Sequence, residues 1–229
     1  YNMMPQIFRL MHKSSSIKLL ICDMVGTTVN EGGAVYTALY ETIRHCGADI
    51  RKQDIQNHYG VEKSVVMRHF LKEDHLVKKA NDMFEDTLLN TYFNEDTDIS
   101  LINPKLPEYF NGLREHGIKV ALNTGYSKNI QQAIIDRLDM NDIIDTYTCP
   151  ELSGGSRPGP NMIYTIMETL NIINPQEVCK VGDTKNDIYE GLYANCGHVV
   201  GVRSGIDTAE KLISAGAHSI VKDVTELEL

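Results

Sequence analysis

The sequence predicts an α/β fold, a doubly wound parallel sheet with a small helical cap domain inserted near its start. Two observations support this prediction. From residue 103 onward, apolar strand-like runs alternate with segments of helical spacing, which is the pattern of crossover connections in a parallel sheet. Between residues 31 and 102, by contrast, only helical spacing is convincing, and no strand is expected there.

The first strand of the core is the apolar run from Ile17 to Asp23, which is rich in Ile and Leu. Such a run is typical of a buried strand, and its last residue is a carboxylate followed closely by Gly26 and Thr27. In an open α/β sheet, ligands bind beyond the carboxyl ends of the strands. Asp23 is therefore expected at the edge of the sheet where a ligand would lie.

The segment that follows this strand is expected to form the cap. Apolar residues follow helical spacing over residues 34–45, 65–71 and 76–92. A structureless stretch of this length would be unusual within a compact domain. We therefore expect a helical cap over residues 31–102 and an α/β core over residues 17–30 and 103–229.

The rest of the core alternates between the two kinds of element. Strands are expected over residues 118–123, 143–147, 178–181 and 198–202, and helices over residues 128–138, 162–170 and 188–194. The strand at 178–181 runs into Gly182 and Asp183 and then into a helix, which repeats the arrangement at Asp23. Two acidic residues at strand ends suggest an oxygen-ligand site for Mg²⁺ and a phosphoryl group.

The composition limits the classes of partner. The 229 residues carry a net charge of −9, which argues against nucleic acid or an anionic membrane as a partner. No apolar run approaches the length of a transmembrane helix. The five cysteines are scattered singly with no CxxC pair, so we expect buried thiols and a reducing, cytoplasmic compartment.

Four short motifs occur in a characteristic order along the chain. They are Asp-Met-Val-Gly-Thr-Thr from Asp23, Asn-Thr-Gly-Tyr from Asn123, Ser-Arg-Pro-Gly-Pro from Ser156 and Gly-Asp-Thr-Lys-Asn-Asp from Gly182. Together they resemble the four ordered motifs of the haloacid dehalogenase superfamily, whose core is Rossmann-like. The resemblance covers nearly everything from Ile17 to the last residue.

Within that superfamily, the chain most resembles the phosphonatase branch and its phosphonatase-like relatives. Val25 replaces the usual second Asp of the first motif, and Arg157 is set in Arg-Pro-x-Pro. The cap segment Gly60-Val-Glu-Lys63 resembles the Gly-x-x-Lys of that branch. This resemblance implies a site between core and cap, beneath a cap that opens and closes.

The resemblance implies that Asp23 is the nucleophile. A carboxylate that attacks phosphorus gives an aspartyl-phosphate, which water then hydrolyses. Asp23 and Asp183 would also be ligands of Mg²⁺, with the backbone carbonyl of Val25 as a third. Asp187 would act through a water or by orienting Arg157, and it is equally well explained as a first-turn acid favoured by the helix dipole.

Other motif residues would bind the phosphoryl group. The hydroxyl of Thr124 and the N–H of Gly125 are expected to hold its oxygens, although Thr-Gly is also an ordinary strand-ending turn. Arg157 would neutralise the charge that develops during transfer, and its alternative is a solvated loop residue. Thr27 is expected beside the substrate in the turn after the nucleophile, where turn chemistry alone would also explain it.

Val25 and Lys63 decide the kind of reaction. Valine cannot pass a proton to a leaving alkoxide, which is the task of the usual Asp. The resemblance implies instead that Lys63, with Gly60 beside the substrate, forms a Schiff base with an aldehyde, so that the protonated imine withdraws electrons during C–P cleavage. Two positions depart from the branch: Val66 stands where it has a His that assists imine formation, and Gly33 stands where it has a Cys. A solvated lysine early in a helix is the alternative interpretation of Lys63.

We therefore expect a Mg²⁺-dependent hydrolase that cleaves the C–P or P–O bond of a small phosphonate or phosphorylated metabolite. The leading substrate is phosphonoacetaldehyde or a close analogue. One alternative is a phosphatase for a good leaving group, such as an acyl phosphate, with Lys63 recognising an anion. Another is a catalytically idle binding protein. By analogy with the family, the helix at 35–43 is compatible with a homodimer formed cap to cap.

Overall fold

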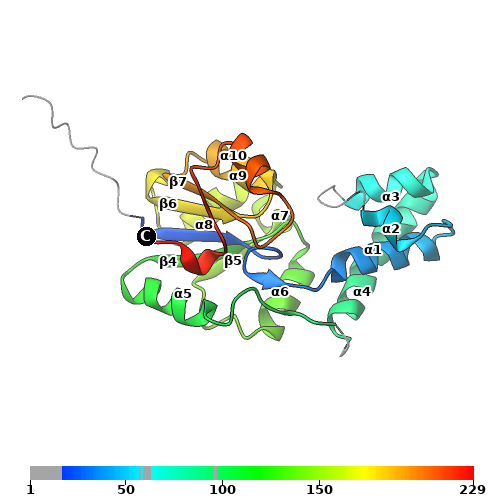
Figure 1. The fold of residues 1–229 in the computed structure, drawn as a ribbon, viewed down its shortest axis with the longest axis horizontal. Helices are drawn as coiled ribbons and strands as arrows, with labels where there is room; N and C mark the ends of the chain where they lie inside the picture. The colour runs from blue at the N-terminus through cyan, green and yellow to red at the C-terminus, as the bar shows by residue number, and fades with distance from the viewer. Residues whose placement is uncertain (1–16, 57, 59–62, 95–96) are drawn as a thin grey trace, which may run out of the picture.

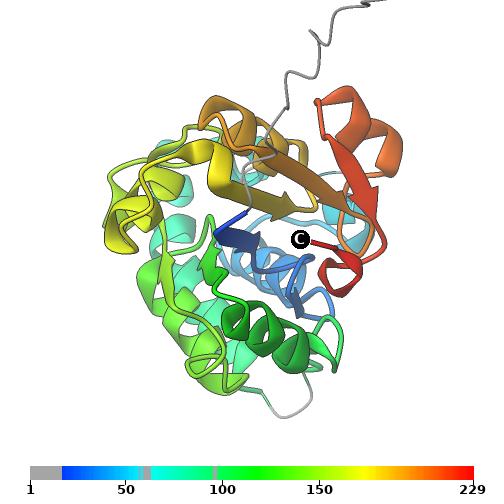
Figure 2. The same ribbon diagram turned by 90° about the vertical axis from the view of Figure 1, so that its left-hand side faces the viewer.

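The core is a six-stranded sheet in the order β5-β4-β1-β6-β7-β8, and every neighbouring pair of strands is parallel. The computed structural model describes residues 17–56, 58, 63–94 and 97–229. The strands of the sheet are β1 (Leu19–Asp23), β4 (Lys119–Asn123), β5 (Thr146–Thr148), β6 (Val178–Gly182), β7 (His198–Val202) and β8 (Ser219–Val221). Helices cover both faces of the sheet (Figures 1 and 2), which confirms the predicted doubly wound α/β fold.

The helices fall into a core set and a cap set. The core helices are α5 (Leu106–Glu115), α6 (Lys128–Arg137), α7 (Pro150–Ser153), α8 (Asn161–Thr169), α9 (Lys185–Tyr193) and α10 (Ala209–Ser214), with short 3₁₀ turns η1 (Pro175–Glu177) and η2 (Val224–Glu226). The cap helices are α1 (Ala34–His45), α2 (Lys52–Gln56), α3 (Lys63–Leu71) and α4 (Asp74–Tyr92). Figure 1 shows the cap helices beyond the carboxyl ends of the strands.

Strand β1 lies at the centre of the fold and is buried along its whole length. Successive side chains of a strand point to opposite faces of the sheet. Accordingly, Leu20 and Cys22 join a cluster that contains Phe110 of α5 and continues into the cap. Leu19 and Ile21 join a second cluster with residues of α8, α9 and α10. A strand that is apolar on both faces explains the unbroken apolar run in the sequence.

The register of β1 brings the site residues together. Asp23 lies opposite Asn123 of β4, and Cys22 lies opposite Val181 of β6. Asp183 follows β6 directly, so the ends of three adjacent strands present polar side chains at one edge of the sheet. This edge faces the cap (Figure 1).

The two chain connections between core and cap pair with each other. Strand β2 (Val29–Asn30) and strand β3 (Ser100–Leu101) form a two-stranded antiparallel ribbon. The expectation of no strand between residues 31 and 102 is therefore wrong at Ser100 and Leu101. Two residues cannot show an alternating pattern, so periodicity could not reveal this strand.

Other boundaries also differ from the sequence analysis. The strand expected over residues 143–147 begins only at Thr146, because Ile143 and Ile144 are buried in the turn after α6 rather than in the sheet. Apolar residues that fill a buried turn look like a short strand in sequence. Helices α2, α5, α7 and α10 and strand β8 were not predicted, and all of these except α5 have six residues or fewer.

The cysteines are buried, as the sequence predicted. All five cysteines are buried thiols without a disulfide. In the described part of the chain, the helices are too short or too polar to span a membrane.

Truncation of the central strand should destabilise the whole core. Replacing Ile21, which is 0% exposed, with Ala leaves a cavity and should lower the free energy of unfolding by about 2–5 kcal/mol. Ile173, which is 92% exposed, is the matched control, and Ile173→Ala should change that free energy by less than about 0.5 kcal/mol. Urea denaturation of the three proteins measures both values, and equal losses would contradict the central position of β1.

Candidate active site

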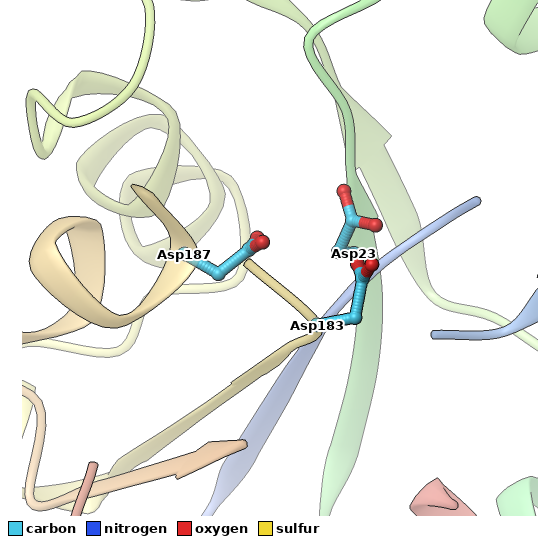
Figure 3. A group of neighbouring side chains, drawn as sticks. All are labelled: Asp23, Asp183 and Asp187. Atoms are coloured by element: carbon cyan, nitrogen blue, oxygen red, sulfur yellow. The ribbon is translucent and has the colours of Figure 1, made fainter. Parts of the chain in front are cut away.

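Three carboxylates gather at the edge of the sheet that faces the cap. Asp23 ends β1, Asp183 follows β6, and Asp187 lies in the first turn of α9. Each offers one oxygen within 4.8 Å of those of the other two (Figure 3), and all three residues are buried. Residues 160 positions apart in the sequence thus meet because adjacent parallel strands end at the same level.

The turn after β1 fits closely around Asp183. Gly26 has a φ of +91°, and a Cβ on it would lie 2.5 Å from Oδ2 of Asp183. Thr27 donates its hydroxyl hydrogen to Oδ1 over 3.3 Å, and the N–H of Ile206 donates to Oδ2 over 2.8 Å. Thr27 is fully buried and does not line the cavity described below, so its expected contact with substrate is corrected: its hydroxyl positions Asp183.

Arg157 links Asp23 to the acidic residues of α9. Its Nη1 lies 2.6 Å from Oδ1 of Asp23 and 3.0 Å from Oδ1 of Asp187. Its Nε lies 2.9 Å from Glu190, and its Nη2 donates to the side-chain oxygen of Asn123 over 2.6 Å. The side chain is only 12% exposed, so Arg157 is a buried organiser of carboxylates and not a solvated loop residue.

Lys180, Glu190 and Asn123 complete this network and were not predicted as site residues. Nζ of Lys180 lies 2.7 Å from Oδ1 of Asn123, 3.1 Å from Asp187 and 3.2 Å from Glu190. Lys180 and Glu190 are both 0% exposed. Two features of the sequence could have indicated their roles. Lys180 lies inside an apolar strand, where a lysine needs a buried partner, and Glu190 lies three residues after Asp187, on the same face of the helix.

Asp187 is held by positive charge. Its Oδ1 forms ion pairs with Arg157 and Lys180 but has no hydrogen-bond partner of good geometry. Its Oδ2 accepts a hydrogen bond from the hydroxyl of Thr184, as part of a capping box at the start of α9. Burial alone would raise the pKa of Asp187, but the charges of Arg157 and Lys180 outweigh it and lower the pKa. Of the two roles expected for Asp187, orientation of Arg157 fits this geometry, and the helix-start role holds as well.

Asp23 and Asp183 have the opposite electrostatic character. Burial raises the pKa of Asp23 to about 6, the charge of Asp187 adds to that increase, and Arg157 opposes it. The pKa of Asp183 is raised well above its ordinary value, first by burial and then by the charges of Asp23 and Asp187. In the described part of the chain, Asp183 makes no ion pair. Of these two carboxylates, only Asp23 is paired with a positive side chain that the structure describes, Arg157, which it shares with Asp187 and Glu190.

The charge balance and the donor atoms fit a divalent cation. Among the described residues, four buried carboxylates (Asp23, Asp183, Asp187 and Glu190) face two cations, the buried Lys180 and the largely buried Arg157. Two negative charges therefore remain when all four carboxylates are ionised. Mg²⁺ prefers oxygen ligands, keeps some of its waters and uses one or two carboxylates. Asp23, Asp183 and the carbonyl of Val25 would hold it.

A cavity of about 530 Å³ lies between this site and the cap. The core lines it with Asp23, Val25, Thr124, Gly125 and Arg157 among others, and the cap contributes Val35, Lys63, Asn81, Phe84 and Glu85. The hydroxyl of Thr124 accepts the N–H of Tyr126 over 3.3 Å, which leaves its own hydrogen available for a phosphoryl oxygen. Core and cap thus contribute to one cavity.

Lys63, the first residue of α3, lines the same cavity as Asp23. Its Nζ lies 5.6 Å from the centre of the Tyr36 ring, a cation–π distance. Gly60, expected beside the substrate, lies outside the described residues. Val66 is fully buried inside the cap and does not line the cavity.

The fold and the site define a hydrolase of known architecture. The family described as haloacid dehalogenase-like hydrolase matches residues 17–195, and the chain belongs to that family. The resemblance of its four motifs to this superfamily is thereby confirmed.

Several relatives carry the name of a phosphonoacetaldehyde hydrolase. The phosphonoacetaldehyde hydrolase of Bacteroides fragilis is 25% identical over 253 residues, covering 92% of this chain and 94% of that protein. The bifunctional phosphonoacetaldehyde hydrolase/aminoethylphosphonate transaminase of Clostridioides difficile is 24% identical over 249 residues, and the match covers 93% of this chain but 39% of that longer protein. A phosphonoacetaldehyde hydrolase-like protein from Oleispira antarctica has a similar structure, with a TM-score of 0.78 and 23% identity over 94% of this chain and 91% of that one.

Removal of the buried lysine should test the network beneath the site. Lys180→Met removes one of the positive charges that offset the buried carboxylates of Asp187 and Glu190, and it should lower the free energy of unfolding by about 3–5 kcal/mol. Lys78→Met breaks the exposed ion pair with Asp82 and should cost less than about 1 kcal/mol. Urea denaturation distinguishes the two, and a small loss for Lys180→Met would contradict the proposed importance of this lysine.

Proposed function

We propose that this protein is a phosphonatase-like, Mg²⁺-dependent hydrolase that cleaves a small phosphonate or phosphate through an aspartyl-phosphate on Asp23. Its leading substrate is phosphonoacetaldehyde or a close analogue. One observation carries this proposal: an amine from the cap, Lys63, and a nucleophilic carboxylate from the core, Asp23, line the same cavity. An aldehyde phosphonate has one reactive group for each of them.

The phosphoryl half of the reaction belongs to the core. An oxygen of Asp23 attacks phosphorus, while Arg157, 2.6 Å from Oδ1 of Asp23, holds the carboxylate and offsets charge on the transferring group. Thr124 and the N–H of Gly125 are positioned on the cavity wall to bind phosphoryl oxygens. Bound Mg²⁺ would supply positive charge to the phosphoryl oxygens. Water then hydrolyses the aspartyl-phosphate.

The carbon half of the reaction belongs to the cap. The neutral amine of Lys63 adds to the aldehyde carbon, and loss of water gives a protonated imine. As phosphorus passes to Asp23, the electron pair of the C–P bond moves toward the imine nitrogen and leaves an enamine on Lys63, which water later hydrolyses. This route needs no acid at Val25, because the imine and not a proton accepts the electrons.

The names of the relatives support the same branch. Proteins called phosphonoacetaldehyde hydrolase match more than nine-tenths of this chain, as in Bacteroides fragilis and Paraburkholderia xenovorans. Their identity of 23–25% is consistent with a shared scaffold and a related substrate.

A phosphatase for acyl phosphates is the second candidate. The observation that favours it is the burial of Val66, the position where the phosphonatase branch has a His: among the described residues that line the cavity there is no imidazole. An acyl phosphate needs no proton on its leaving group, so Val25 would be no obstacle. In that case Lys63 would serve as a fixed positive charge for an anionic substrate.

Asp23→Ala should reduce Mg²⁺-dependent phosphate release to the background rate, because the acceptor of the phosphoryl group is gone. The measurement is phosphate release from phosphonoacetaldehyde and from acetyl phosphate, with and without Mg²⁺. Asp136→Ala, an exposed acid on α6, should retain the wild-type rate. Turnover by Asp23→Ala would contradict both candidate reactions.

Borohydride trapping should decide between the two candidate reactions. With phosphonoacetaldehyde and borohydride, the wild type should gain a covalent adduct at Lys63, located by mass spectrometry of peptides. Lys63→Arg should form none, because an arginine does not deprotonate in proteins and cannot form a Schiff base. Lys79→Arg, an exposed position on α4, should still form the adduct. Phosphate release from acetyl phosphate without any adduct would select the phosphatase.

A further inference from the structure

Glu31 is a carboxylate of the cavity lining that has no role in the proposed reaction. Glu31 lies between β2 and α1, where the chain passes from core to cap. It is only 5% exposed, yet it lines the same cavity as Lys63 and Asp23. Acidic side chains are almost never buried to this degree unless other polar groups bind them.

The partners of Glu31 come from three separate segments. The hydroxyl of Tyr92, the last residue of α4, donates to Oε2 of Glu31. The N–H of Val35 in α1 donates to Oε1 over 3.4 Å. The hydroxyl of Tyr126, in the core loop after β4, lies 3.4 Å from that of Tyr92. Glu31 is thus fixed by both ends of the cap, and through Tyr92 by the core.

The environment of Glu31 suits a group that exchanges protons. Burial raises the pKa of Glu31 above its ordinary value, while the hydrogen bonds from Tyr92 and Val35 and the charge of Lys63 oppose that rise. The carboxyl group therefore lies within the electrostatic reach of Lys63. Burial stabilises the neutral acid, whereas the hydrogen bonds and the positive charge stabilise the carboxylate.

Among the described residues that line the cavity, few can exchange a proton with the amine of Lys63. Val25 and Val66 cannot carry a proton, and Val66 does not line the cavity. Among the described lining residues, Asp23, Asp183 and Asp187 belong to the phosphoryl site. Glu85 also lines the cavity, but it is only partly buried and accepts the hydroxyl hydrogen of Ser127 over 2.8 Å. Glu31 is the buried carboxylate that shares the cap side with Lys63.

We propose that Glu31 is the acid–base partner of Lys63, held in place by the hydroxyls of Tyr92 and Tyr126. The inference rests on the proposed imine chemistry. The carboxylate of Glu31 takes a proton from the ammonium group of Lys63, which leaves a neutral amine and a neutral carboxylic acid. The amine adds to the aldehyde carbon as the C=O π electrons move to oxygen, and a proton shifts from nitrogen to oxygen to give a carbinolamine. Glu31 returns its proton to the hydroxyl oxygen as the C–O bond breaks, and water and the protonated imine result.

The test isolates imine formation from C–P cleavage. Protein treated with a chelator is mixed with phosphonoacetaldehyde, quenched with borohydride at successive times, and analysed for the adduct at Lys63 by mass spectrometry. Glu31→Gln keeps the size of the side chain and one of its two acceptor atoms but cannot exchange the proton, so the rate should fall about 100-fold or more. Glu31→Asp keeps the carboxyl group and should stay within about tenfold of the wild type.

The order of these two variants separates the proposed role from a structural one. A structural role would favour Gln, the closer match in size, whereas acid–base catalysis favours Asp. Glu41→Gln makes the same chemical change at an exposed position of α1 outside the cavity and should leave the rate of adduct formation within about twofold of the wild type. Circular dichroism of each variant verifies folding. If neither Glu31 variant folds, Tyr92→Phe removes the hydrogen bond to Glu31 and should slow adduct formation about tenfold.

The outcomes distinguish this inference from the proposed function. If the wild type forms an adduct and Glu31→Gln forms it at the same rate, or faster than Glu31→Asp, the inference alone is overturned. An unchanged rate in Tyr92→Phe, where that variant is needed, overturns it as well. If the wild type forms no adduct, the imine route and this inference both fail.

Discussion

The candidate active site depends on one buried electrostatic network, in which Arg157 and Lys180 hold together acidic side chains from the end of β1 and from α9. Arg157 joins Asp23 at the end of β1 to Asp187 and Glu190 on α9, and Lys180 supports both of the latter from within β6. Without these two cations, several buried carboxylates would repel one another in a region of low polarity. The network therefore lets the core keep several acidic groups close together and still remain folded.

The same network divides the acidic groups by task. Asp187 and Glu190 are paired with positive side chains, and the pKa of Asp187 is lowered. Asp23 and Asp183 lie on the cavity side, and burial raises the pKa of each. The site thus combines acids that Arg157 and Lys180 compensate with a second pair, Asp23 and Asp183. Among the residues that the structure describes, only Asp23 of this pair contacts a positive side chain, and bound Mg²⁺ would compensate the pair further. This division explains why four carboxylates are compatible with one buried cluster.

The sequence predicted most of the scaffold and the motif residues. The long apolar run before Asp23 and the regular alternation after residue 103 identified a parallel sheet, because burial on both faces demands continuous apolar strands. The helix over 34–45 was predicted with its observed bounds, since its apolar spacing is clear. The ribbon of β2 and β3 was missed because two residues carry no period, and Ile143 and Ile144 were mistaken for strand because a buried turn is also apolar.

What the sequence alone determined is which chemical groups follow the strands: an acid, a Thr-Gly turn, a basic loop residue and a second acidic motif, in an order that identifies the family. Only the tertiary structure decided how other groups join them. Lys180, Glu190 and Glu31 belong to no motif, and Thr27 turns its hydroxyl to Asp183. The physical reason is that a motif is a short stretch of sequence that reflects local structure. A charge network and a cavity wall, by contrast, are formed by side chains that meet only when distant strands and helices pack together.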